Sequence, residues 1–260
     1  MAKKLAATKL LVRVQAKGGK FLADDIGGAE VTIREARTGE RLGGGLVQGG
    51  DSGSLGTVYA ANASQLAVVT PGSPGKPPTI RWLVPDSKTS NLTVELPLTR
   101  PTLLEVEAYG PLGGLQSAQR VVSTTWAVPG QPIDQGPGFV VELPGLVVQI
   151  QEPPTHLNLE TVPATVPFKV NVTMMCGCPI SPSEPWLPTD FVVTADIGLV
   201  GQAPTKTVTL GFANMAPSLF TGQIVLTKPG YYQAAITAVQ QSTGNVGTGT
   251  VTFFVTPPSS

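Results

Sequence analysis

The chain has 260 residues, with 17 Lys and Arg against 17 Asp and Glu, so its formal net charge is zero. Charged residues are only 13% of the sequence, against roughly 25% in an average soluble domain. A chain without a basic excess or a basic run lacks the electrostatic features of a nucleic-acid binder, and no apolar run approaches the roughly 18 residues of a membrane-spanning helix. The single histidine excludes most histidine-based catalysis and metal binding.

Apolar and polar residues alternate through the first half of the chain, which is the pattern of half-buried strands. Turn residues rich in Gly, Asp and Pro separate these segments, and the glycine run at residues 43–45 is expected to form a flexible loop. No segment keeps a helical period of apolar residues for long. The expected strands are residues 9–15, 29–35, 57–61, 79–84, 92–96, 103–108, 120–125, 139–143 and 146–150.

Consecutive prolines at Pro153 and Pro154 indicate a change of domain, because they favour an extended, semi-rigid linker. We therefore expect an N-terminal sandwich with long loops over residues 1–152, a linker over 153–160 and a C-terminal sandwich over 161–260. Short strands at spacings near ten residues are typical of a β-sandwich. The strands expected in the second domain are residues 168–174, 191–197, 207–212, 220–226, 231–239 and 248–255.

The predicted fold class is all-β, with two or three tandem β-sandwich domains of immunoglobulin-like or transthyretin-like type. The third domain is left open because residues 60–150 are longer than one sandwich module needs. They are expected to hold an extra strand pair or a small third unit.

The end of the chain carries a family resemblance. A turn at Pro229-Gly230 leads into a strand with Tyr231, and a loop from Gly244 to Gly247 containing Asn245 precedes a final Val- and Phe-rich strand. This arrangement resembles bacterial immunoglobulin-like and fibronectin-III-like domains over residues 160–257. The resemblance implies a fold and names no ligand.

The start of the chain resembles a different sandwich. The strand residues 12–14, the segment Gly28 to Ile33, the Thr38-Gly39-Glu40 turn and the Asp51-Ser52-Gly53 loop are similar to carboxypeptidase-regulatory or transthyretin-like domains. The enzymatic branch of the transthyretin family relies on histidines. The only histidine here, His156, lies outside the matching region, so the resemblance implies no enzymatic activity.

The sharpest local motif is the segment containing Met175, Cys176 and Cys178. Cysteines at i and i+2 of an extended strand point to the same face, where with Met175 they would form a soft-metal site suited to Cu(I). The same two thiols would also form a strained, reducible disulfide. The third interpretation is a pair of inert, packed thiols. No cofactor is expected beyond the copper alternative.

Two further residue groups bear on function. Trp82, Trp126 and Trp186 would bind polysaccharide if they formed an exposed row, although aromatic residues of sandwiches are more often in the core. His156 has no acid or nucleophile beside it in the sequence and is expected to be a surface residue rather than a catalytic one.

These observations predict a non-catalytic binding or structural module, and not an enzyme, that acts through protein–protein contact or self-association. Unprotected strand edges of such sandwiches pair with other chains. The low charge favours an exported, extracellular or cell-surface protein, with the cytoplasm as the alternative. No signal peptide is predicted in this chain, because Lys9 and Arg13 interrupt the first apolar stretch. The rival hypotheses are a copper or thiol-redox protein built on Cys176 and Cys178, and a carbohydrate-binding accessory domain.

Overall fold

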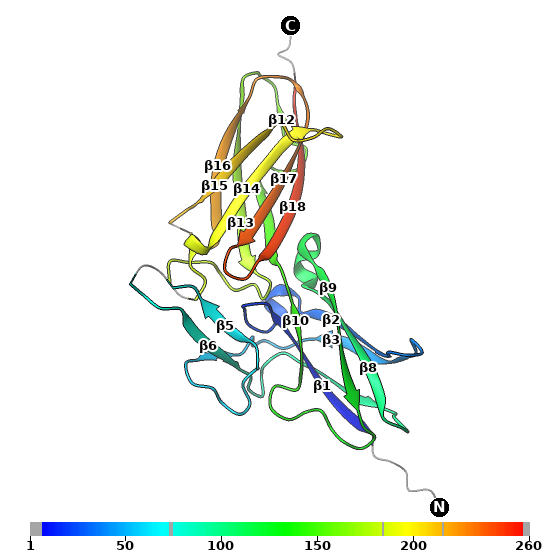
Figure 1. Cartoon of the computed structure of the whole chain (residues 1–260). Helices are drawn as coiled ribbons and strands as arrows, with labels where there is room; N and C mark the ends of the chain where they lie inside the picture. The colour runs from blue at the N-terminus through cyan, green and yellow to red at the C-terminus, as the bar shows by residue number, and fades with distance from the viewer. Residues whose placement is uncertain (1–6, 73–74, 184, 215, 257–260) are drawn as a thin grey trace, which may run out of the picture. The chain divides into compact units, whose positions relative to one another are not determined.

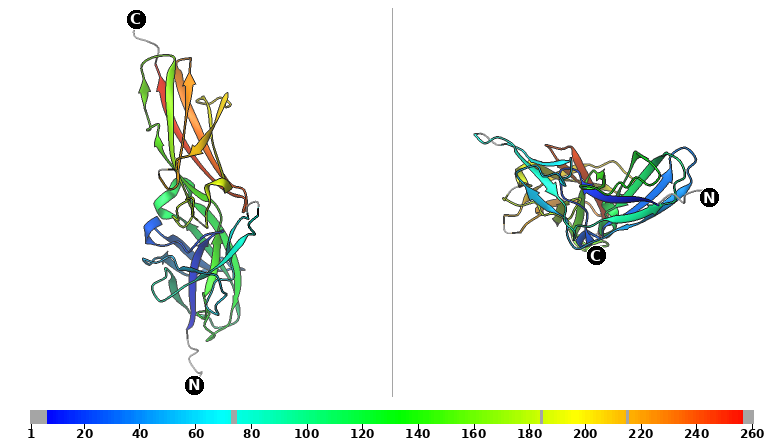
Figure 2. Two further views of the ribbon diagram at one scale, coloured as in Figure 1. Left: turned by 90° about the vertical axis from the view of Figure 1, so that its left-hand side faces the viewer. Right: turned by 90° about the horizontal axis from the view of Figure 1, so that it is seen from below.

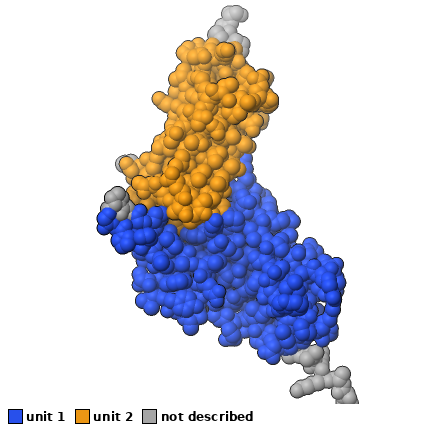
Figure 3. All heavy atoms as spheres, viewed as in Figure 1, with its two compact units in different colours: residues 1–144, 175–178 blue, residues 145–174, 179–260 orange. Residues whose placement is uncertain are grey.

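The computed structural model describes residues 7–72, 75–183, 185–214 and 216–256 (Figure 1). Within these ranges every named element is a strand or a short 3-10 helix, which confirms the predicted all-β class. The chain forms two compact units (Figure 3). The first unit contains Met1–Pro144 and Met175–Cys178, and the second contains Gly145–Met174 and Pro179–Ser260.

The first unit begins with a strand and carries two 3-10 helices, η1 and η2, between its strands. Its elements are β1 Thr8–Ala16, η1 Asp24–Ile26, β2 Ala29–Glu35, β3 Arg41–Val47, β4 Ser54–Gly56, β5 Ala67–Thr70, β6 Thr79–Val84, β7 Leu92–Leu96, β8 Thr102–Gly110, η2 Leu112–Ser117, β9 Gln119–Ala127 and β10 Phe139–Leu143.

Two sheets form the sandwich of the first unit. A three-stranded sheet in the order β10-β1-β7 packs against a four-stranded sheet in the order β3-β2-β8-β9. Alternate residues of each strand face inward, and Val12, Ile33 and Val106 are fully buried there. The period-two pattern of strands such as β2 and β8 has a direct cause, because one face of their sheet meets the core. Strand β1 differs, because its residues Val12–Ala16 are all buried.

The long stretch between β3 and β7 folds into a third, three-stranded sheet in the order β4-β6-β5. Buried polar groups attach it to β1. The Gln15 amide donates hydrogen bonds to the carbonyl oxygens of Gly19 (3.1 Å) and Leu66 (3.0 Å) and accepts one from the Ser64 hydroxyl. This sheet belongs to the first unit, and the chain has two units rather than three.

Two local predictions in this unit were wrong. The glycine run at 43–45 is not a loop but the middle of β3. A Cβ atom at Gly43 would lie 2.7 Å from Val94 Cγ1, and one at Gly45 would lie 3.0 Å from Leu92 Cδ1, so the glycines let β3 pass close to β7. Residues 57–61, expected as a strand, form bends and a turn in which Val58 is exposed.

The second unit has longer strands, which run lengthwise through it in the left panel of Figure 2, coloured from green to red. Its elements are β11 Leu146–Glu152, β12 Asn158–Leu159, β13 Ala164–Met174, η3 Pro188–Asp190, β14 Phe191–Leu199, β15 Lys206–Phe212, β16 Leu219–Leu226, β17 Gly230–Gln240 and β18 Asn245–Val255.

The second unit is a sandwich in which β11, β13 and β16 form one layer and β14, β17 and β18 form the other. Strand β15 pairs with β14 over most of its length and with β16 at Gly211 and Phe212, so it connects the two layers. The short strand β12 runs parallel to the end of β18. The order is that of strands A, B and E facing C, F and G in an immunoglobulin-like sandwich.

A tyrosine corner supports this assignment. Tyr232, near the start of β17, is buried, and its hydroxyl donates a hydrogen bond to the carbonyl oxygen of Lys228 at 2.9 Å. Its ring stacks on Phe253 with the centroids 5.8 Å apart. Immunoglobulin-like domains place a tyrosine at the same corner, bonded to backbone a few residues upstream.

The division between the units falls at Pro144 and Gly145, before the expected linker. Residues 146–152 belong to the second unit because β11 pairs with β13. The expected linker, residues 153–160, also lies in the second unit, where Asn158 and Leu159 pair with Phe254 and Val255. In the described part of the chain, no helix has the length and apolar character needed to cross a bilayer.

Candidate binding surfaces

Strand β9 forms one edge of the four-stranded sheet of the first unit. It is nine residues long and pairs with β8 alone, at the end of the four-stranded sheet. Arg120 is its only charged residue, and it contains no proline, lysine or glycine. Natural edge strands are usually short or carry such residues, which prevent pairing with other chains. The β9 edge has little of this protection.

The hydrogen-bond pattern of β8 determines which backbone groups of β9 face outward. The backbone N–H of Ala36 donates to the Leu103 carbonyl oxygen, so Leu103 directs its polar groups away from β9. N–H and C=O groups alternate in direction along an antiparallel strand. In the register of the two strands, Leu103 lies opposite Trp126, so Trp126 and every second residue before it direct their backbone N–H and C=O groups away from β8. No described residue forms a hydrogen bond with these outward-facing groups of the four β9 residues. These residues are Arg120, Val122, Thr124 and Trp126.

The side chains of the same four residues lie on the outer face of the sheet. Val122 is 48% exposed and Trp126 is 64% exposed. Arg120 lies over the ring of Tyr109 at 5.6 Å and forms an ion pair with Glu107 at 3.3 Å. The edge therefore offers unpaired backbone, two exposed apolar side chains and one cation held in place.

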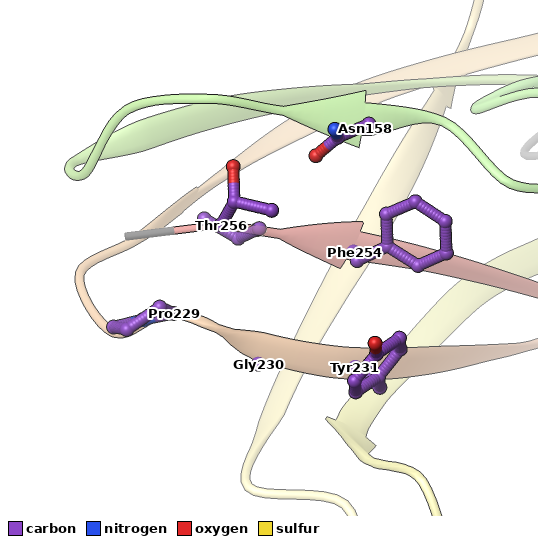
Figure 4. A pocket seen from close by; sticks show the side chains of 7 residues that line it. Asn158, Pro229, Gly230, Tyr231, Phe254 and Thr256 are labelled. Carbon is purple, nitrogen blue, oxygen red and sulfur yellow. The ribbon is translucent and has the colours of Figure 1, made fainter. Parts of the chain in front are cut away.

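The second unit carries an aromatic recess of about 410 Å³ (Figure 4). Tyr231 on β17 and Phe254 on β18 lie side by side with ring centroids 5.4 Å apart at an interplanar angle of 74°. Tyr231 is 69% exposed. Pro229, Gly230, Asn158, Val255 and Thr256 complete the lining.

His156 borders this recess rather than a catalytic cluster. Its ring lies 6.3 Å from that of Phe254, and its backbone N–H donates to the Thr252 carbonyl oxygen at 3.0 Å. The side chain is exposed, as expected. Among the described residues, no acid, serine or cysteine side chain is hydrogen-bonded to the imidazole. The site therefore offers ring stacking and a few polar groups, which suit binding.

The cysteine motif lies in a turn, not on the extended strand that the sequence suggested. β13 ends at Met174, and Gly177 adopts the left-handed conformation with φ of 75°. The backbone N–H of Lys20 lies 3.4 Å from Cys176 Sγ, to which it donates, and Cys178 Sγ lies 4.0 Å from the Cys176 carbonyl oxygen. Both cysteines are free thiols, with Cys176 buried and Cys178 half-buried.

The two thiols interact. The hydrogen bond from Cys178 to Cys176, together with burial, raises the pKa of the Cys178 thiol. Thiolates rather than thiols attack electrophiles and bind metals, so this contact lowers the reactivity of Cys178 at neutral pH. Met175 is buried beside the pair. In the ranges that the structure describes, no group of three or more His, Cys, Asp and Glu side chains is placed to hold a metal ion.

The tryptophans do not form a row. Trp186 is buried in the second unit, whereas Trp82 and Trp126 lie on different sheets of the first. Trp82 packs against Tyr59 edge to face at 5.1 Å. Of the three, only Trp126 presents most of its ring to solvent. Polysaccharide binding stays a prediction.

Sequence reasoning identified the motifs of these surfaces but not the surfaces themselves. The alternation in β9 was visible, yet nothing local marks a strand as an edge. Tyr231 and Phe254 are distant in sequence and meet through the register of β17 with β18.

The comparisons with known proteins address the fold. No family model matches the sequence, and no curated protein matches it. Among solved structures, an engineered protein is 21% identical over 48% of this chain, with a TM-score of 0.29. The chain spans only 22% of the length of that protein.

Other matches extend over most of the chain. The fibronectin(III)-like modules of Clostridium thermocellum CbhA are 9% identical, with 98% of this chain and 93% of that chain covered and a TM-score of 0.28. A chain from the complex of Dpr2 Ig1-Ig2 with DIP-Theta Ig1-Ig3 is 12% identical, with 96% and 99% covered and a TM-score of 0.30. Both matches are to fibronectin-III or immunoglobulin-like modules. These likenesses carry no argument about function, and the assignment of the second unit depends on its strand order and tyrosine corner. The transthyretin-like character of the first unit stays a prediction.

Proposed function

We propose that this chain is a non-catalytic binding and assembly module. The observation that carries the proposal is the β9 edge, where Arg120, Val122, Thr124 and Trp126 direct backbone groups outward. An extended strand added there would satisfy these groups and cover Val122 and Trp126. Strand addition of this kind is a common way for sandwiches to bind other chains.

The aromatic recess of the second unit supports the same function independently. An exposed tyrosine beside a second ring supplies apolar contact area at low cost in side-chain entropy. A protein ligand would bury Tyr231 against Phe254 and hydrogen-bond to Asn158 or Thr256. Two surfaces of this kind, one in each unit, suit a module that joins chains.

Native mass spectrometry of the protein purified from its source tests the proposal. We expect a species whose mass is a multiple of this chain, or the sum of this chain and a protein partner. Trp126→Ala and Tyr231→Ala variants should reduce that species, whereas Tyr59→Ala, which alters an exposed aromatic residue outside both surfaces, should not. A strictly monomeric protein that recovers no partner would overturn the proposal.

The thiol pair supports a second candidate function in soft-metal or thiol-redox chemistry, because Cys176 and Cys178 are free thiols that lie in one turn next to Met175. Titration with Cu(I) under reducing conditions tests it. Stoichiometric binding that is lost in both Cys176→Ser and Cys178→Ser would support a metal site, and a weaker affinity in Met175→Leu would assign the thioether as a ligand. If the folded protein bound no Cu(I), the proposed copper function would be wrong.

We also propose export from the cell, which is supported by the low charge content alone. Fractionation of source cells with an antibody against the chain tests it. Recovery in the extracellular or surface fraction would agree with the proposal, and recovery only with cytoplasmic proteins would contradict it.

A further inference from the structure

We infer that the β9 edge binds a second copy of this chain, with the two β9 strands antiparallel about a two-fold axis at Ser123. The inference rests on the proposed function and names both the surface and its occupant. Ser123 is the central residue of the strand Gln119–Ala127, so this register overlaps the full length of both strands. The contact would join two four-stranded sheets into one continuous sheet.

The register meets the backbone requirement. Around an axis at Ser123, Arg120 lies opposite the partner's Trp126, and Val122 lies opposite the partner's Thr124. All four are residues whose N–H and C=O groups face away from β8. Residues of this kind form the hydrogen-bonded pairs of an antiparallel ladder, in which each pair exchanges two bonds. Every outward group of the edge then has a partner.

The side chains are complementary in the same register. Each Arg120 guanidinium would lie beside the indole of the partner's Trp126, where cation and ring attract each other. Val122 and Thr124 would form pairs of β-branched residues, which stabilise sheets. Arg120 is already held on this face by Tyr109 and Glu107.

Charge distribution favours the antiparallel two-fold over a parallel arrangement. The only charged residue of β9 is Arg120, at one end of the strand. In an antiparallel pair the two arginines lie at opposite ends of the contact. A parallel pair in register would place them directly opposite one another, where like charges repel. A two-fold contact also closes, so it gives a dimer rather than a fibre.

Cysteine cross-linking of the full chain tests the register. Ser123 and the partner's Ser123 would form a non-hydrogen-bonded pair with Cα atoms about 4.5 Å apart, which a disulfide can bridge. Ser123→Cys protein should therefore form a covalent dimer under mild oxidation, with peptide mapping to distinguish this bond from any at Cys176 or Cys178. The matched control is Thr125→Cys, another half-buried position of β9 that faces inward. In this register the two copies of residue 125 are offset by four residues, roughly 14 Å, and should not cross-link.

A non-covalent measurement tests the edge without cysteine. Thr124→Lys places a charge at the edge and should raise the dimer dissociation constant roughly tenfold or more in sedimentation equilibrium. Thr32→Lys is the control, because Thr32 lies on the same sheet face but in strand β2, away from the edge. Unchanged circular dichroism in both variants would show that they fold.

The outcomes separate this inference from the proposed function. Selective cross-linking at Ser123 together with loss of dimer in Thr124→Lys supports the inference. A wild-type protein that associates, or binds another protein, but cross-links no faster at Ser123→Cys than at Thr125→Cys keeps the binding function and overturns the β9 dimer. A monomer without any partner overturns both.

Discussion

Asn245 at the start of β18 is expected to be one of the most sensitive polar residues of the second unit. Its side chain is buried. Asn245 Oδ1 accepts a hydrogen bond from the backbone N–H of Gly145 at 3.1 Å, and Nδ2 donates to Gln240 Oε1 at 3.1 Å. One amide thus connects the residue just before β11, the end of β17 and the start of β18.

The structure sets the size of the effect of Asn245→Ala. The Gly145 N–H would be left buried without this partner, at a cost of about 1–3 kcal/mol. Gln240 Oε1 would lose one bond, worth about 1 kcal/mol, but keeps the bond from Thr243 Oγ1 at 2.7 Å. We therefore expect the second unit to lose about 2–4 kcal/mol of unfolding free energy.

Chemical denaturation measures this loss if the signal comes from the second unit alone. Trp186 is buried there, so its fluorescence in a background with Trp82→Phe and Trp126→Phe reports that unit. Asn214→Ala, at an exposed position of the same unit, is the control and should change stability by less than about 0.5 kcal/mol. If Asn245→Ala were as stable as this control, the role assigned to the buried amide would be refuted.

Three further predictions follow from individual contacts. Tyr232→Phe removes the hydrogen bond to the Lys228 carbonyl oxygen and should lower the unfolding free energy of the second unit by about 1 kcal/mol in the same denaturation assay. An unchanged denaturation midpoint would show that the tyrosine corner does not contribute to the stability of this unit. Gly44→Ala should destabilise the first unit by more than about 2 kcal/mol in thermal unfolding, because the new Cβ would lie 2.4 Å from the backbone carbonyl oxygen of Val31 in β2. Gly50→Ala is the control and should be nearly neutral, because no atom lies within 4 Å of its Cβ position. The pKa of the Cys178 thiol is raised in the folded chain, so above about pH 8.5 the unfolded chain loses this proton while the folded chain keeps it. The free energy of unfolding should therefore fall as the pH rises above about 8.5, by up to about 1.4 kcal/mol per pH unit. Denaturation of folded Cys178→Ser protein over the same pH range should show a shallower fall, and an identical one would contradict the assignment.

The sequence by itself determined the all-β class, because period-two alternation reflects a sheet with one buried face. Strand β2 was predicted at Ala29–Glu35, the bounds that the structure has, since its alternate residues Val31 and Ile33 are buried. The Gly-rich strand β3 was missed because the prediction depends on alternating side chains, which a run of glycines does not have. Glycine has no side chain to alternate, and the need for it arises only where Val94 of another strand approaches Gly43.

The candidate sites were decided by tertiary structure. The cysteines were evident in the sequence, but only the folded chain places them in a turn at Gly177 and brings the backbone N–H of Lys20 to Cys176 Sγ. The pairing of Tyr231 with Phe254 depends on strand register. Whether a strand is central or at an edge depends on which neighbours the rest of the chain supplies. The local pattern of β9 therefore predicts a strand, and only its position at the end of the sheet supports the proposal that it binds another chain.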